Sequence, residues 1–225
     1  TIVQSLYPNA QSVSAWGGED DETAQYGVVK IAIKAASGST LTNITKQSIV
    51  TQLKRYNVAS VRPVIVDPEI TKLLLTTNVK YDNKTTTKTS DTLKSAVLTT
   101  LTNYNNNTLT KFEGVFRFSK VTGLIDNTDS SILSNITNLK IRKDFQPALA
   151  ASTKYNVFFR NALYNPHSGH NMAAGGILES SGFKVSGDAT TIFYLDDDGA
   201  SNVRRYSFSG STRVYANNTQ GTINY

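Results

Sequence analysis

The sequence predicts an α+β fold in which a ferredoxin-like domain with the split βαβ arrangement precedes a β-rich C-terminal domain. Two observations predict it. Between residues 26 and 145, segments with the alternating pattern of strands are interrupted by two segments with helical spacing of apolar residues. After residue 145, only short strand candidates and turns remain. Composition agrees, because 28 threonines, 22 serines and 20 asparagines among 225 residues favour strands and turns over long helices.

The chain begins with polar residues and then turns to alternating ones. Residues 1–25 are expected to form an irregular arm that carries one large aromatic side chain, Trp16. Residues 28–34 alternate between apolar and more polar side chains, which is typical of a half-buried strand. Thr42 can cap a helix that runs to about Tyr56. This part therefore predicts an arm, a strand and a helix.

Two strands are expected next. Residues 61–66 form the first, and Asp67-Pro68 marks the turn after it. Residues 70–81 form a longer strand with apolar residues on both faces, because Leu73 and Leu74 point in opposite directions. Since helices cover only one face of a ferredoxin-like sheet, the side chain of Leu74 needs cover from the C-terminal part or from another chain.

A second helix is expected to start with Ser90 as its cap, followed by a fourth strand over residues 112–118. In that strand, phenylalanines alternate with other residues. A short helical turn over residues 121–125 and a further strand over residues 132–142 complete this part. The resulting order of strand, helix, strand, strand, helix, strand is the split βαβ arrangement.

The predicted domains are an irregular N-terminal arm at residues 1–25, a ferredoxin-like domain at residues 26–145 and a β-rich domain at residues 146–225. The junction lies near residues 145–151. In the last domain, Asp196-Asp197-Asp198-Gly199 forms the predicted turn of a hairpin. Strand candidates there are residues 155–159, 177–185 with a break at Gly182, 191–195, 203–208 and 213–216. Because the chain starts without methionine and ends in what resembles a strand, we expect it to be a piece of a longer polypeptide.

The net charge of +6 is distributed unevenly. Residues 24–125 carry 14 basic residues against five acidic ones, and an acidic cluster, Glu19-Asp20-Asp21-Glu22, precedes them. The basic residues are dispersed as single positions, which favours a solvated surface or an acidic protein neighbour over nucleic acid. The aromatic residues also do not occupy the strands on which RNA-recognition domains stack bases. No apolar run approaches the length of a membrane span, so no membrane insertion is expected.

No constellation of residues indicates catalysis or a cofactor. The chain has no cysteine, and its two histidines, His167 and His170, lie in a loop rich in proline and glycine where their spacing specifies little. Asp196, Asp197 and Asp198 could hold Ca²⁺ but lack the ligand spacing of a calcium loop, so a turn is favoured. We therefore expect no enzyme activity, no metal and no cofactor.

Ordered short motifs give the chain a recognisable resemblance. They are the stretch from Trp16 to Lys34, Tyr56-Asn-Val58, Val66-Asp-Pro68, Tyr81-Asp82, Phe116-Arg-Phe-Ser119, Ile125-Asp126, Asn165-Pro-His-Ser-Gly-His170, Ser181-Gly-Phe-Lys-Val-Ser-Gly187 and Tyr194-Leu-Asp-Asp-Asp-Gly199. Together they resemble the C-terminal portion of the large baseplate wedge subunit of contractile-tailed bacteriophages, which is grouped with the baseplate J-like family.

This resemblance implies a late structural protein of the virion, located in the tail baseplate and assembled in the host cytoplasm. A wedge subunit of this kind links wedges into a ring and rearranges to release sheath contraction. The implied partners are further copies of the chain and the other wedge and hub proteins. The alternative is a β-rich receptor- or glycan-binding module of a phage tail, with Tyr194 and Asp196–Asp198 as candidate binding residues.

Three residues are candidate protein–protein contacts. Trp16 stands beside a Gly-Gly pair and is either a core residue or an aromatic interface anchor. Leu74 lies on the strand face that the helices are not expected to cover. Phe116 belongs to the phenylalanine-rich fourth strand.

Overall fold

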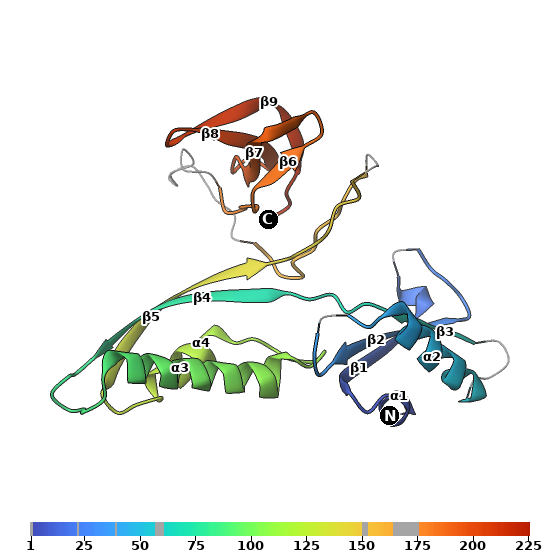
Figure 1. Ribbon diagram of the computed structural model, residues 1–225, viewed down its shortest axis with the longest axis horizontal. Helices are drawn as coiled ribbons and strands as arrows, with labels where there is room; N and C mark the ends of the chain where they lie inside the picture. The colour runs from blue at the N-terminus through green and yellow to red at the C-terminus, as the bar shows by residue number, and fades with distance from the viewer. Residues whose placement is uncertain (1, 22, 39, 57–60, 150–152, 164–175) are drawn as a thin grey trace. The chain divides into compact units, whose positions relative to one another are not determined.

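The computed structural model describes residues 2–21, 23–38, 40–56, 61–149, 153–163 and 176–225. The chain forms two compact units, Thr1–Leu149 and Ala150–Tyr225, which we describe separately (Figure 1). The first unit combines helices with two sheets, and the second contains four antiparallel strands. The predicted α+β class with a β-rich C-terminal region is therefore confirmed.

The first sheet has the order β1-β2-β3. It consists of β1 (Ala10–Gly17), β2 (Val28–Ala35) and β3 (Arg62–Val66), with β1 antiparallel and β3 parallel to the central β2. Helices α1 (Ile2–Leu6) and α2 (Asn43–Leu53) contribute to its core, and α2 also forms the crossover between the two parallel strands. The buried residues of this core are Val3, Ile31, Ile33, Ala35, Leu41, Ile49 and Leu53.

The second sheet is a two-stranded antiparallel ribbon of β4 (Lys72–Tyr81) and β5 (Ile132–Arg142). The chain between these strands forms α3 (Ser90–Tyr104), the π-helical turn η3 (Asn105–Leu109) and α4 (Phe118–Asp126), and both α-helices pack on one face of the ribbon (Figure 1). A two-stranded ribbon is marginal by itself, so this helical layer is what stabilises it. Its buried core residues are Val97, Tyr104, Val121, Ile125 and Ile132.

The strands occur largely where the sequence predicts them, but they do not form one ferredoxin-like sheet. Residues 112–118 are not a strand: the segment turns, and Phe118 begins α4. Gly114 donates its N–H to the Lys111 carbonyl at 2.9 Å. A Cβ at Gly114 would lie 2.4 Å from the Thr108 carbonyl oxygen, so the chain passes too close to η3 for an extended strand. The five strands described in this unit form two separate sheets, β1-β2-β3 and β4-β5.

The expectation of an irregular N-terminal arm is also wrong. Helix α1, strand β1 and the short 3₁₀ helix η1 (Gly18–Asp20) order this segment, and β1 pairs with β2 so that Trp16 lies opposite Lys30. The strand was hidden in the sequence because its residues are mostly small or polar. An edge strand of this kind obtains its order from backbone pairing with one neighbour more than from an apolar face.

Threonine hydroxyls cap both longer helices. Thr42 is the N-cap of α2, as predicted, and its Oγ1 accepts a hydrogen bond from the N–H of Thr45 at 3.2 Å. The helix continues into the 3₁₀ turn η2 (Lys54–Tyr56), close to its predicted end. The cap of α3 is Thr89, which accepts from the N–H of Thr92 at 3.3 Å, and not the predicted Ser90. Two adjacent hydroxyl residues left the exact cap ambiguous in the sequence.

The second unit is an antiparallel meander of β6 (Phe183–Val185), β7 (Asp188–Asp197), β8 (Asn202–Ser209) and β9 (Thr212–Thr222). The predicted hairpin between β7 and β8 is confirmed. Gly199 in its turn has a φ of 71°, a conformation that favours glycine. Residues 155–159 are described but form no strand, which contradicts that candidate.

The loop before β5 contains an acid whose ionised form the fold stabilises. Asp129 accepts hydrogen bonds from Lys88 Nζ and from Ser131 Oγ at 2.6 Å, and its side chain is only 8% exposed. The Lys88 hydrogen bond, followed by those of Ser131, lowers the pKa of Asp129. Because the folded-state pKa is depressed, the carboxylate stabilises the fold above its unfolded pKa of about 3.9 and loses this effect at lower pH.

We therefore expect Asp129→Asn to lower the free energy of unfolding of the first unit at pH 7. The difference from the wild type should shrink as the pH falls from about 5 towards 2. Urea unfolding followed at pH 7, 5 and 3 measures it. Glu113→Gln, which removes an exposed carboxylate of the same unit, is the control. A difference that stays constant over this pH range would contradict the prediction.

Candidate interaction surface

The outer face of the β4–β5 ribbon is exposed and partly apolar. We use the name outer ribbon face for the alternate residues that point away from the helical layer: Lys72, Leu74, Thr76, Asn78 and Lys80 of β4 with Ser134, Ile136, Asn138, Lys140 and Arg142 of β5. Leu74 is 45% exposed and Ile136 is 69% exposed. Leu133, at the irregularity in the strand register, adds a further side chain that is 61% exposed. Exposed aliphatic side chains on one sheet face are a feature of contact surfaces.

The ribbon register explains how this face is organised. Leu74 lies opposite Lys140, and Ile136 lies opposite Asn78. The two apolar side chains are therefore separated along the ribbon by hydroxyl and amide residues. Such a mixture of apolar anchors and hydrogen-bonding groups is the composition of a wet interface between preformed subunits.

Positive charge surrounds the apolar residues. Lys72 and Arg142 face each other across the strands, where like charges repel. Asp144 accepts hydrogen bonds from Lys72 Nζ at 2.6 Å and from Arg142 Nε at 2.5 Å, so one carboxylate bridges both cations. These partners, Lys72 first, lower the pKa of Asp144. With Lys80 and Lys140 added, the outer ribbon face remains positive and is complementary to an acidic protein surface.

The structure places the three predicted contact residues on different elements. Leu74 lies on the outer ribbon face. Phe116 is half-buried and packs against the core between the ribbon and its helices, which makes it a poor contact residue. Trp16 is half-buried on β1, and its indole N–H donates to Asp21 at 3.3 Å, while Asp21 also forms an ion pair with Lys30. Lys30 lowers the pKa of Asp21. Trp16 thus belongs to a polar cluster beside the sheet.

Sequence reasoning missed Ile136. Part of the signal was available, because apolar residues occupy both parities of the predicted strand, with Ile132 and Ile136 at even positions and Leu133, Leu139 and Ile141 at odd ones. Apolar residues of both parities predict that some of them point away from the core. The partner strand and the helices were needed to decide which face is covered.

Family comparison agrees with a role in assembly. Residues 1–66 match the family model described as baseplate structural protein gp6, C-terminal domain I, and residues 73–144 match C-terminal domain III of the same protein. The two matches cover more than half of the chain. This chain is a phage baseplate structural protein. A search of curated proteins finds no match. The narrower assignment to the baseplate J-like family stays a prediction.

The domain limits of the family follow the structure of this baseplate protein. The first match ends at Val66, the last residue of β3, and the second begins at Leu73, the second residue of β4. Each match therefore contains one sheet and its own buried core. Apart from Lys72, the outer ribbon face belongs to the match with C-terminal domain III. No helix in the described part of the chain is long and apolar enough to cross a membrane.

Asp196 and Asp197, predicted as turn residues, are the last two residues of β7 and make internal contacts in the second unit of the baseplate protein. Asp196 is 1% exposed and accepts from Arg204 Nε at 3.1 Å, Arg213 Nη1 at 2.9 Å and Tyr215 OH at 2.9 Å. Asp197 is fully buried and accepts from Tyr225 OH at 2.6 Å. Burial, together with this hydrogen bond, raises the pKa of Tyr225 to about 12. Both buried carboxylates therefore take part in contacts within the second unit.

The other residues considered for glycan or metal binding lie in an aromatic stack or outside the described part of the chain. Tyr194 is a predicted glycan-binding residue, together with Asp196–Asp198. Its ring stacks on that of Tyr206, with 5.5 Å between the ring centroids. His167 and His170 lie outside the described residues. Among the residues that the structure describes, no group of three metal-ligating side chains is found.

Proposed function

We propose that this baseplate protein is a wedge subunit of a contractile tail. In this role it links wedges into a ring around the tube, contacts further copies of itself together with the other wedge and hub proteins, and rearranges when sheath contraction is released. The observation that carries the proposal is the pair of consecutive matches to gp6 C-terminal domains, one of which bears an exposed apolar face. Assembly takes place in the host cytoplasm.

The outer ribbon face supports a contact that is weak alone and strong in a ring. Burial of apolar surface contributes roughly 25 cal/mol per Å², and the exposed aliphatic side chains here are few. Association of two free molecules costs at least about 4 kcal/mol of lost translational and rotational freedom. In a ring each subunit is held by several contacts at once, so each further contact forms at high effective concentration. We infer a monomer or weak dimer in solution and a firm contact in the particle.

Electron microscopy of the intact particle tests this proposal. We expect the chain in a ring around the tail tube, with the outer ribbon face against a neighbouring subunit. A reconstruction that places the chain outside the baseplate would refute the wedge assignment. A reconstruction that places it in the ring with this face in solvent would refute only the choice of contact surface.

We also propose that the two compact units are separate domains joined near the predicted junction. Lys154 and Arg160 are exposed and lie at the start of the second unit outside any helix or strand. Brief trypsin treatment should therefore cut there first and release a stable fragment containing the first unit, as mass spectrometry would show. A variant with both residues changed to glutamine should resist this cut. Initial cleavage inside α3 or the β4–β5 ribbon would contradict separate domains.

A further inference from the structure

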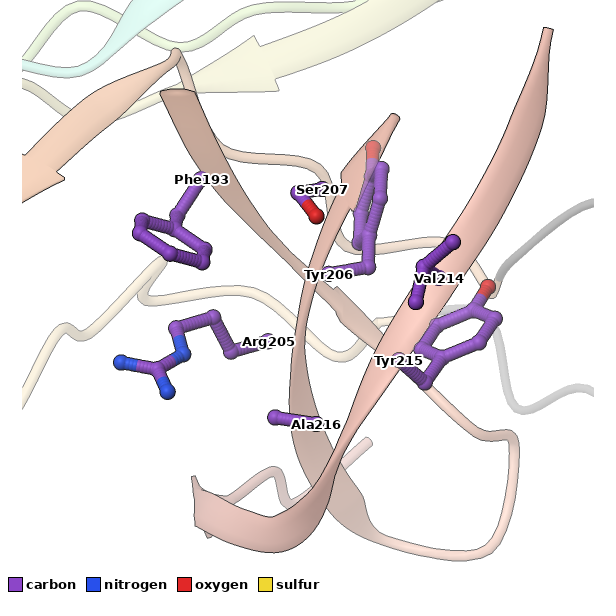
Figure 2. A pocket seen from close by; sticks show the side chains of 7 residues that line it. All are labelled: Phe193, Arg205, Tyr206, Ser207, Val214, Tyr215 and Ala216. Atoms are coloured by element: carbon purple, nitrogen blue, oxygen red, sulfur yellow. The ribbon is translucent and has the colours of Figure 1, made fainter. Parts of the chain in front are cut away.

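A small pocket in the second unit contains an arginine whose charge is not paired. The pocket has a volume of about 180 Å³ and opens on the sheet formed by β7, β8 and β9 (Figure 2). Its lining is mostly apolar or aromatic. The lining residues are Phe193, Arg205, Tyr206, Ser207, Val214, Tyr215 and Ala216.

The three arginines of β8 and β9 differ in their partners. Arg204 and Arg213 both form ion pairs with Asp196 inside the sheet. Arg205 points to the opposite side of β8 because side chains alternate along a strand. Among the described residues no carboxylate pairs with it, and its Nε is buried without a hydrogen-bond partner. A buried donor that lacks an acceptor is uncommon and destabilising, so it requires an explanation.

The position of this guanidinium is fixed from one side. Arg205 lies over the ring of Phe193, with 4.7 Å between the guanidinium carbon and the ring centroid, and Figure 2 shows the two side chains next to each other. Such a contact holds the charge in place without neutralising it. Ser207 lies two residues along the same strand, so its hydroxyl adds a second donor on the same side. The pocket thus offers fixed donors within an apolar lining.

We propose that this pocket binds the carboxylate of an aspartate or glutamate side chain presented by a partner protein. A carboxylate supplies the acceptor that Arg205 lacks, and guanidinium–carboxylate pairs are among the strongest hydrogen-bonded pairs in proteins. Pockets for small ligands usually measure about 300–1,000 Å³, so this smaller volume fits one side chain better than an extended ligand. The proposal depends on the proposed baseplate role for one point only, namely that the partner is a protein.

Nuclear magnetic resonance of the full 225-residue chain tests the pocket directly. The probe is N-acetyl-glutamate N-methylamide, and the readout is the Nε–Hε resonance of Arg205, assigned by its loss in Arg205→Lys. We expect a saturable chemical-shift change with a dissociation constant on the order of 10 mM. Binding is this weak because the probe makes only one contact. The matched glutamine compound should bind roughly tenfold more weakly because it lacks the charge. The Arg204 resonance, which belongs to an internal ion pair, should not move.

Several outcomes would overturn the proposal. They are an Arg205 resonance that does not move, an equal response to the glutamine compound, and unchanged glutamate binding in a folded Arg205→Gln variant, followed there by the backbone amide resonance of Ser207. Glucuronate binding about tenfold tighter than the glutamate compound would assign the pocket to an acidic sugar instead. If Arg205→Gln does not fold, Ser207→Ala replaces it and should weaken binding about threefold; unchanged binding would contradict the site. Since the titration uses the isolated chain, its failure leaves the proposed baseplate role intact.

Discussion

Replacement of Asp196 by alanine is expected to destabilise the second unit strongly and leave the stability of the first unit unchanged. The carboxylate is almost completely buried and accepts hydrogen bonds from two arginines and a tyrosine. Removing one partner of a buried ion pair costs about 3–5 kcal/mol because the remaining charge is left unpaired. Arg204 and Arg213 are each about a quarter exposed and can turn towards water, so we expect the lower end of that range.

This loss is large compared with the stability of a unit of this size. Domains are stable by roughly 0.05–0.15 kcal/mol per residue, which gives roughly 4–11 kcal/mol for Ala150–Tyr225. A loss of about 3 kcal/mol lowers the Tm of such a unit by about 12 °C or more. Hydrogen exchange with mass spectrometry reads each unit separately. Amides of β7, β8 and β9 should lose protection, whereas those of α3 and β5 should keep it.

Two variants define the control. Asp20→Ala removes an equal charge from an exposed position in the first unit and should change the stability of the second unit by less than about 0.5 kcal/mol. Asp196→Asn keeps one acceptor oxygen and should fall between the wild type and Asp196→Ala. If the amides of β8 are protected equally in Asp196→Ala and in the wild type, the Asp196 carboxylate does not stabilise the sheet.

Much of the local structure of the first unit could be predicted from the sequence. Strand β2 alternates in polarity, and the observed β5 spans the predicted residues 132–142. What the sequence could not show is the number of sheets. Residues 112–118 pair with no strand, and Gly114 instead lies close to η3. The approach is a tertiary contact between segments, so periodicity within one segment does not report it.

The candidate surface was predictable only in part. Leu74 was found because its strand has apolar residues of both parities, and the structure places this side chain on an exposed sheet face. Phe116 was misplaced because the alternation of phenylalanines was interpreted as a strand, whereas the segment lies in a turn and packs on the core. Asp196 and Asp197 seemed to be turn residues, since no sequence pattern shows that arginines from β8 and β9 would enclose Asp196.

Replacement of Leu74 by aspartate is expected to prevent incorporation of the chain into baseplates without unfolding it. The side chain is 45% exposed, so the change removes little burial from the folded chain and should alter its stability by about 0.5 kcal/mol or less. In an interface, the same change leaves a charge without water or a partner. Truncation of a central contact residue commonly costs 2 kcal/mol or more of binding free energy, and a buried unpaired charge adds to that.

The repeated contact of a ring multiplies this effect, because every subunit carries the variant. Complementation of a phage that lacks the gene measures this effect. Leu74→Asp should yield purified particles depleted in the chain, while circular dichroism and thermal unfolding of the isolated variant match the wild type.

Ile136→Asp on β5 should behave in the same way. Leu98→Asp is the matched control, because Leu98 is 55% exposed but lies on α3, on the other side of the ribbon. Normal incorporation of both ribbon variants would show that the outer ribbon face makes no essential contact, whereas equal loss with Leu98→Asp would show that any new charge disturbs assembly.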